Sequence, residues 1–214
     1  MTEVQGGNAT TRQDSDAPGD QYRDYEFAGM AHLDSREADA YYPNPCRYPI
    51  SRFPMGAYIS VALHHLFQWV DKGVVPPRAD RMLVDRNVAN DGSLMALDEF
   101  GSPKGGIRNP YVDQPVKSYH VRNEGANPPI ADAHPFVASR GIDAQNQLCG
   151  LAGYEVDLTQ AQLKKLYKDK KDYVSRVAGR LEELTKQGWS LPVYKDYILQ
   201  DAARAILARR RAGE

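Results

Sequence analysis

At 214 residues the chain is long enough for one domain with a sizeable core, and its formal net charge of −1 gives no electrostatic basis for binding nucleic acid or an anionic membrane surface. No apolar run approaches the length that spans a bilayer, and the polar first twenty residues cannot be a secretory signal. As written, the sequence therefore predicts a cytoplasmic protein without a membrane partner.

The first predicted strand and the turn after it, residues 22–35, carry the most informative histidine. Tyr25 and Phe27 predict a short strand, and Ala28-Gly29 predicts a tight turn that places His32 just beyond the strand end. A histidine held in this way can act as a general base, but from these residues alone an ordinary loop histidine is the favoured interpretation. Residues 1–21 precede it as loop, except that residues 1–4 resemble the end of another strand.

The middle of the chain predicts one long helix between loops. Four prolines make residues 40–54 an extended segment, and Gly73 ends a helix over residues 55–72. Asn90-Asp91-Gly92 is typical of a hairpin turn between residues 81–86 and 94–98. The helix has apolar residues at helical spacing, which we expect to be buried against a sheet: Ile59, Ala62, Leu63, Leu66, Phe67 and Val70.

The second half predicts a long loop followed by helices. Residues 100–150 are rich in Gly, Pro and Asn, and only residues 115–121 predict a strand, at a sheet edge. From Leu158 onward the pattern is helical, and Thr159 with Gln162 forms a capping box. Two apolar stripes follow, at residues 174–184 and 198–206, with Gly188 closing the first.

Nucleophile, metal and cofactor motifs are absent from the sequence. No serine lies in a G-x-S-x-G elbow, and Ser190, the nearest miss, is predicted to cap a helix N-terminus. The remaining histidines, His64, His65, His120 and His134, show no metal-ligand spacing, and no phosphate loop or dinucleotide fingerprint is present. We therefore predict no cofactor.

The two cysteines, Cys46 and Cys149, form no C-x-x-C motif. In a reducing compartment we expect two free thiols, with one long-range disulfide as the alternative.

Four stretches, read together, resemble a known family. They are residues 23–34 (RDYEFAGMAHLD), 43–46 (PNPC), 98–119 (DEFGSPKGGIRNPYVDQPVKSY) and 149–151 (CGL). Their order and spacing resemble the C-terminal portion of the alpha/beta hydrolase domain-containing family of bacterial esterase-like proteins, over almost the entire chain. The resemblance implies an α/β fold with the last sheet strands at residues 1–4 and 23–27. A covering helix at 55–72, a small β-hairpin with a wrapping loop, and a helical tail would follow.

By this resemblance the chain is a single unit, with a loop start (1–21), a strand, histidine turn and helix (22–85), a hairpin and loop (86–157) and a helical tail (158–214). The implied function is hydrolysis of a small-molecule carboxylic ester, with His32 as general base and then general acid. Glu3 is the first candidate acid, followed by Asp14 and Asp16.

The missing nucleophile elbow predicts a truncated hydrolase that depends on the N-terminal part of its domain for activity. A non-catalytic binding or structural module is the competing hypothesis. If members of the family work outside the cytoplasm, Cys46 and Cys149 would form a disulfide.

Overall fold

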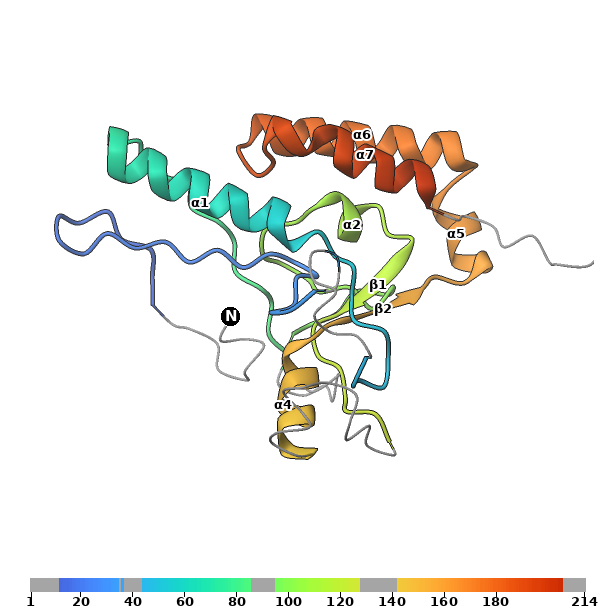
Figure 1. The fold of residues 1–214 in the computed structure, drawn as a ribbon. Coiled ribbons are helices and arrows are strands. Elements are labelled where there is room, and N and C mark those ends of the chain that lie inside the picture. The colour runs from blue at the N-terminus through green and yellow to red at the C-terminus, as the bar shows by residue number, and fades with distance from the viewer. Residues whose placement is uncertain (1–11, 35, 37–43, 86–94, 128–141, 206–214) are drawn as a thin grey trace, which may run out of the picture.

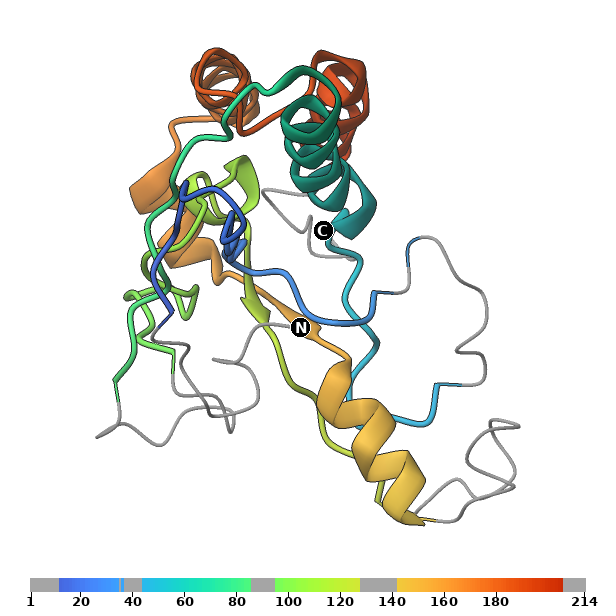
Figure 2. The ribbon, with the colours of Figure 1, turned by 90° about the vertical axis from the view of Figure 1, so that its left-hand side faces the viewer.

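The computed structural model describes residues 12–34, 36, 44–85, 95–127 and 142–205. A small sheet lies between a group of helices at one end of the molecule and a single helix at the other (Figures 1 and 2). In chain order the elements are α1 (Met55–Lys72), α2 (Pro110–Asp113), β1 (Lys117–His120), α4 (Ile142–Leu151), β2 (Tyr154–Asp157), α5 (Gln160–Leu166), α6 (Lys170–Lys186), η2 (Pro192–Tyr194) and α7 (Lys195–Arg204).

The sheet consists of β1 and β2, which run antiparallel with Lys117 opposite Asp157 and His120 opposite Tyr154. The predicted edge strand at 115–121 is confirmed as β1, whereas β2 was not predicted. Other extended segments among the described residues meet through single bridges. Among the described residues the sheet therefore has two strands, neither of which is one of the last sheet strands that the family resemblance implies.

The predicted strand at residues 23–27 is corrected to extended chain with one parallel bridge, between Phe27 and Ile107. The partner chain turns away on one side through Gly105 and Gly106, which have φ angles of +74° and +66°, and the helical turn α2 begins on the other side. A ladder cannot continue past such bends, so a single residue pair remains. Residues 1–4, the other predicted strand, lie outside the described residues.

In the described parts of the predicted loop at 100–150 the structure has helices α2 and α4, which corrects that expectation. The Asn109 side chain caps α2 by accepting a hydrogen bond from Tyr111 N at 3.0 Å. The turn predicted at residues 90–92 lies outside the described residues. Its flanks Val84 and Met95 pair in the antiparallel sense that a hairpin requires.

The helices of the C-terminal third follow the sequence prediction. Thr159 and Gln162 form the predicted capping box of α5, and α6 ends just before Gly188, which has a φ angle of +84°. The cap predicted for Ser190 is wrong. Leu191 occupies the N-cap position of η2, and Ser190 is buried just before it. Buried side chains of α5, α6 and α7 form one core: Leu163, Tyr173, Val177, Leu181, Ile198 and Ala202.

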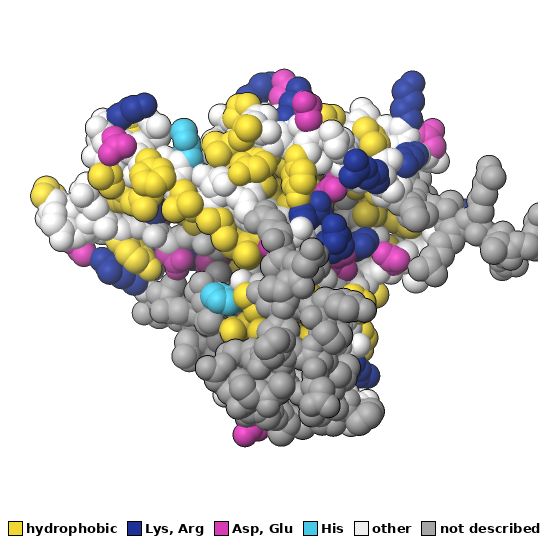
Figure 3. All heavy atoms as spheres, viewed as in Figure 1, with side chains coloured by type: hydrophobic (Ala, Val, Ile, Leu, Met, Phe, Trp, Pro, Cys, Tyr) yellow, Lys and Arg dark blue, Asp and Glu magenta, His cyan; other side chains and the backbone are white. Residues whose placement is uncertain are grey.

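Helix α1 has the predicted bounds, but most of its predicted buried face is exposed. The exposed fractions of Leu63, Leu66 and Phe67 are 45%, 48% and 57%. The buried residues are Ala57, Tyr58 and Val61. They all lie in the first two turns, because the rest of the helix extends past the central core (Figure 1). Figure 3 shows hydrophobic side chains along this outer side of the molecule. We call the exposed set the α1 face: Ile59, Leu63, Leu66, Phe67 and Val70.

No helix among the described residues combines the length and the apolar composition that crossing a membrane requires.

Candidate functional site

The turn that carries His32 depends on Gly29. Its φ angle is +81°, a conformation that L side chains rarely adopt. A Cβ atom at this position would lie 3.0 Å from Val112 Cγ1 and 3.2 Å from Tyr119 Cβ. Met30 N closes the turn by donating to Phe27 O at 3.3 Å. Both backbone conformation and packing therefore require glycine here.

The segment around Ile107 fixes the backbone of this turn. Ile107 N donates to Glu26 O at 2.7 Å, and Ala28 N donates to Ile107 O at 3.0 Å. The fully buried Asn109 adds a side-chain hydrogen bond from Nδ2 to Ala28 O at 2.7 Å. A Cβ on Gly106 would come within 2.6 Å of Glu26 O, so this close approach also needs glycine. Two of the stretches that carry the family resemblance thus form one rigid support.

His32 itself lies exposed between two fixed points of the backbone. The turn precedes it, and after it Leu33 N donates to Leu151 O at 3.2 Å while Leu33 pairs with Ala152 in the parallel sense. Neighbouring protein atoms displace water from part of the ring and lower the pKa of His32. Within the described part of the chain, its ring makes no hydrogen bond. An imidazole of lowered pKa that is open to solvent can act as a base near neutral pH.

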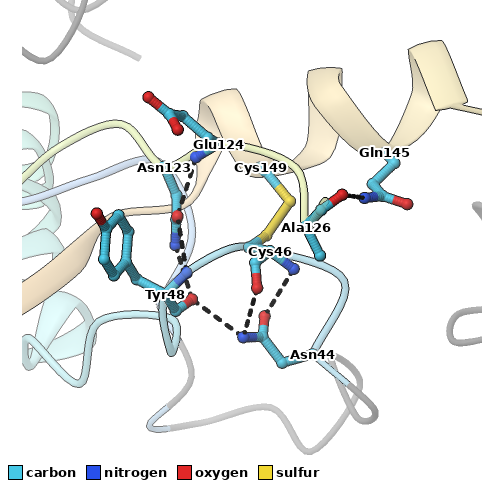
Figure 4. The surroundings of a disulfide bond; sticks show 8 residues. All are labelled: Asn44, Cys46, Tyr48, Asn123, Glu124, Ala126, Gln145 and Cys149. Atoms are coloured by element: carbon cyan, nitrogen blue, oxygen red, sulfur yellow. Dashed lines mark hydrogen bonds between the residues drawn. A yellow bond between two sulfur atoms is a disulfide. The ribbon is translucent and has the colours of Figure 1, made fainter. Parts of the chain in front are cut away.

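A disulfide joins Cys46 to Cys149 beside the Leu33 contact, with a Cα–Cα distance of 5.5 Å (Figure 4). This corrects the expectation of two thiols: the residues are 103 positions apart in sequence, so nothing local indicated that they meet. The Asn44 side chain orders the loop by donating to Cys46 O and Tyr48 O at 3.1 and 3.0 Å. The other two resemblance stretches are therefore covalently joined, and Cys149 precedes the Leu151-Ala152 segment that fixes the chain after His32.

The candidate acids are not brought to His32 within the described residues. Glu3 lies outside them. Asp14 accepts a hydrogen bond from Arg81 at 3.0 Å, and Asp16 accepts one from Arg78 at 2.7 Å. Hydrogen bonds from Arg78 and Arg23 lower the pKa of Asp16. Both aspartates thus belong to an arginine network, which gives them a structural role of their own.

The side chain of Asp34, two residues after His32, also makes a hydrogen bond to another group and not to His32. Its buried carboxylate accepts the backbone N–H of Arg36 at 2.7 Å. The acid that would orient His32 remains a prediction for Glu3.

Strand β1 carries a serine–histidine contact that was not predicted. Ser118 Oγ and His120 Nε2 lie 3.2 Å apart, and the His120 ring stacks on Tyr154 with a centroid distance of 4.4 Å. The period-two alternation of the predicted strand was the signal that could have paired them. Ser118 is buried and also lies 3.5 Å from Val156 O. This pair therefore serves to hold β1 against β2, since a nucleophile needs an exposed hydroxyl.

A cavity of about 700 Å³, which was not predicted, lies between the sheet and the helices α5, α6 and α7. Arg36 and Asp201 form an ion pair of 2.8 Å at its wall, and Tyr111 donates to Asp201 at 2.6 Å. His32 is not among the lining residues.

Within the described part of the chain, no group of three or more His, Cys, Asp and Glu side chains could hold a metal ion.

Comparison with known proteins gives one result. A family model described as "Alpha/beta hydrolase domain" matches residues 1–200. Neither the search of curated proteins nor the search of solved structures found a match.

Proposed function

The chain belongs to the alpha/beta hydrolase domain family, and we propose that it contributes the catalytic histidine, His32, to a hydrolase of carboxylic esters. The observation that carries this proposal is the exposed ring of His32 on a backbone fixed from both sides. A general base needs this combination, because its ring must reach the substrate while its position stays constant.

In this reaction His32 takes the proton of a serine hydroxyl as the serine attacks the ester carbonyl, and then returns a proton to the leaving alcohol. Water hydrolyses the acyl-enzyme by the same two proton transfers. The 214 residues contain no G-x-S-x-G elbow. We therefore assign the nucleophile to another part of the hydrolase domain, and Glu3 stays the proposed acid.

The α1 face supports a partner of this kind. Amphipathic helices of α/β folds bury their apolar side against a sheet, and the exposed fraction of Phe67 is 57%. The sheet formed by β1 and β2 leaves this face uncovered. We propose that further strands of the hydrolase domain cover it, next to the segment that bears the serine.

The test is turnover of p-nitrophenyl butyrate by the protein expressed from its native gene. We expect hydrolysis, and a loss of about a thousandfold or more in kcat for His32→Ala. His64→Ala is the matched control, because His64 is an exposed histidine on α1, and it should keep full activity. Full activity in His32→Ala would reject His32 as the base.

A non-catalytic module is the second candidate, and the uncovered α1 face is the observation that favours it. A well-folded protein from the native gene that turns over no ester would support this interpretation.

The disulfide bears on the cellular location of the protein, since such bonds persist in oxidising compartments. Titration of thiols in unfolded, unreduced protein from the native host tests the predicted cytoplasmic location: two reactive thiols support it, and none favours export.

A further inference from the structure

The cavity between the sheet and the helices has the size of a small-molecule site. Its floor comes from β1 and β2, and its walls come from α5, α6 and α7. A volume of about 700 Å³ lies within the range of roughly 300–1,000 Å³ that is typical of pockets for small organic ligands. Buried apolar side chains of Leu158 and Leu163 form part of the lining, so the cavity can take an apolar body.

The acidic groups of the lining already have partners. Glu155 accepts from Lys117 Nζ at 2.7 Å. Asp201 pairs with Arg36 at 2.8 Å and accepts from Tyr111 at 2.6 Å. These carboxylates are neutralised within the protein, so they offer little attraction for a cationic ligand.

Several donors of the lining, in contrast, lack an acceptor. The hydroxyls of Tyr119 and Tyr173 make no hydrogen bond to another described residue, although their exposed fractions are only 5% and 6%. The guanidinium groups of Arg52 and Arg204 likewise make no ion pair within the described ranges. Four cationic and three acidic side chains line the cavity, an excess of one positive charge. Neither hydroxyl oxygen is among the side-chain atoms that are shut off from solvent without a partner, so both can donate a hydrogen bond to an acceptor bound in the cavity.

The two hydroxyls are suited to donate together. Burial raises the pKa of Tyr173 to about 12 and that of Tyr119 well above its ordinary value, so both are protonated at neutral pH. Both residues line the same cavity, so both hydroxyls are available there as hydrogen-bond donors.

We propose that this cavity binds a small organic acid, whose carboxylate accepts hydrogen bonds from Tyr119 and Tyr173 and is attracted by Arg52 and Arg204. The apolar part of the acid packs against Leu158 and neighbouring apolar side chains. One monoanion balances the single excess positive charge of the lining. The inference goes beyond the proposed function, because His32 does not line this cavity and binding requires no turnover.

The test is calorimetric titration of the full 214-residue chain with benzoate and hexanoate, against benzamide and hexanamide as neutral analogues of equal size. We expect at least one acid to bind at millimolar or lower concentration, and its amide to bind about tenfold more weakly or not at all. Tyr173→Phe and Arg204→Gln should each weaken binding of the acid by about threefold to tenfold. Tyr167→Phe is the control, because Tyr167 packs on Tyr173 but its hydroxyl donates to Pro115 O outside the lining.

A second measurement separates binding from folding. Without ligand, Tyr173→Phe should leave the melting temperature nearly unchanged, since its hydroxyl makes no hydrogen bond to a described residue, whereas Tyr167→Phe should lower it. Failure of both acids to bind, equal binding of acids and amides, or unchanged affinity in Tyr173→Phe and Arg204→Gln would each overturn the proposal. A fall in melting temperature for Tyr173→Phe equal to that for Tyr167→Phe would do so as well.

Discussion

Helices α1 and α6 have the same kind of sequence pattern and opposite surroundings. In α6, Val177, Leu181 and Leu184 are all at most 2% exposed, and α7 packs against this helix. In α1, Leu66 and Phe67 have exposed fractions of 48% and 57%. Periodicity shows which side of a helix is apolar, whereas burial requires another element of the right shape to cover that side. The difference identifies α1 as the helix that still needs a partner.

The largest expected change in the free energy of unfolding comes from a substitution in α6. Leu181→Ala should lower the free energy of unfolding by about 3 kcal/mol, because it removes buried methyl groups and leaves a cavity in the helical core. Urea unfolding followed by circular dichroism measures this. A loss below about 1 kcal/mol would mean that α6 is not packed as described.

The corresponding change on α1 should be far smaller. Phe67→Ala in the 214-residue chain should alter the free energy of unfolding by no more than about 0.5 kcal/mol, because the side chain has little packing to lose. The same variant should reduce the fluorescence of a bound hydrophobic dye such as ANS, which reports exposed apolar surface. A loss similar to that of Leu181→Ala would show that the α1 face is already covered, for example by self-association, which sedimentation would detect.

The smallest expected change in stability comes from His65, a residue of α1 that contacts the segment after α6. His65 Nε2 lies 2.9 Å from Gly188 O, and the ring packs edge-on against Trp189. Burial lowers the pKa of His65, so the folded state favours the neutral ring. The stability from this site is fully present above the unfolded-state pKa of about 6.5 and declines as the pH falls through that value toward the folded pKa.

Urea unfolding at pH 7.5 and pH 5.5 tests this, with His65→Gln compared to the parent. The parent should lose more stability than the variant between these two values. An identical loss in both proteins would show that the contact of His65 does not depend on its protonation.

Local signals in the sequence were enough for α1, for the C-terminal helices and for the turn before His32, but not for α2 and α4. The bounds of α1, the capping box of Thr159 and Gln162 and the end of α6 before Gly188 depend on residues within a few positions of one another. Strand β2 was missed, because it is recognisable only once β1 is beside it. The disulfide was only the alternative to two thiols, because its cysteines lie 103 positions apart in the sequence.

The candidate site divides in the same way. The glycine turn could be predicted from residues 22–35 alone, whereas the proposed role of His32 also needed the family resemblance of the stretches downstream. The support from Ile107 and Asn109, and the cavity lined by Tyr119 and Tyr173, arise only when segments about eighty or fifty residues apart come together. The pairing of Ser118 with His120 was within reach, because a strand places alternate residues on one face.

The most direct test of the central claim is the pH dependence of kcat/KM for p-nitrophenyl butyrate in the protein from the native gene. If His32 is the base, kcat/KM should fall on the acid side with an apparent pKa below 6.5, the direction in which partial desolvation shifts His32. The residual activity of His32→Ala should lack this acid limb. An acid limb that persists unchanged in His32→Ala would contradict the assignment.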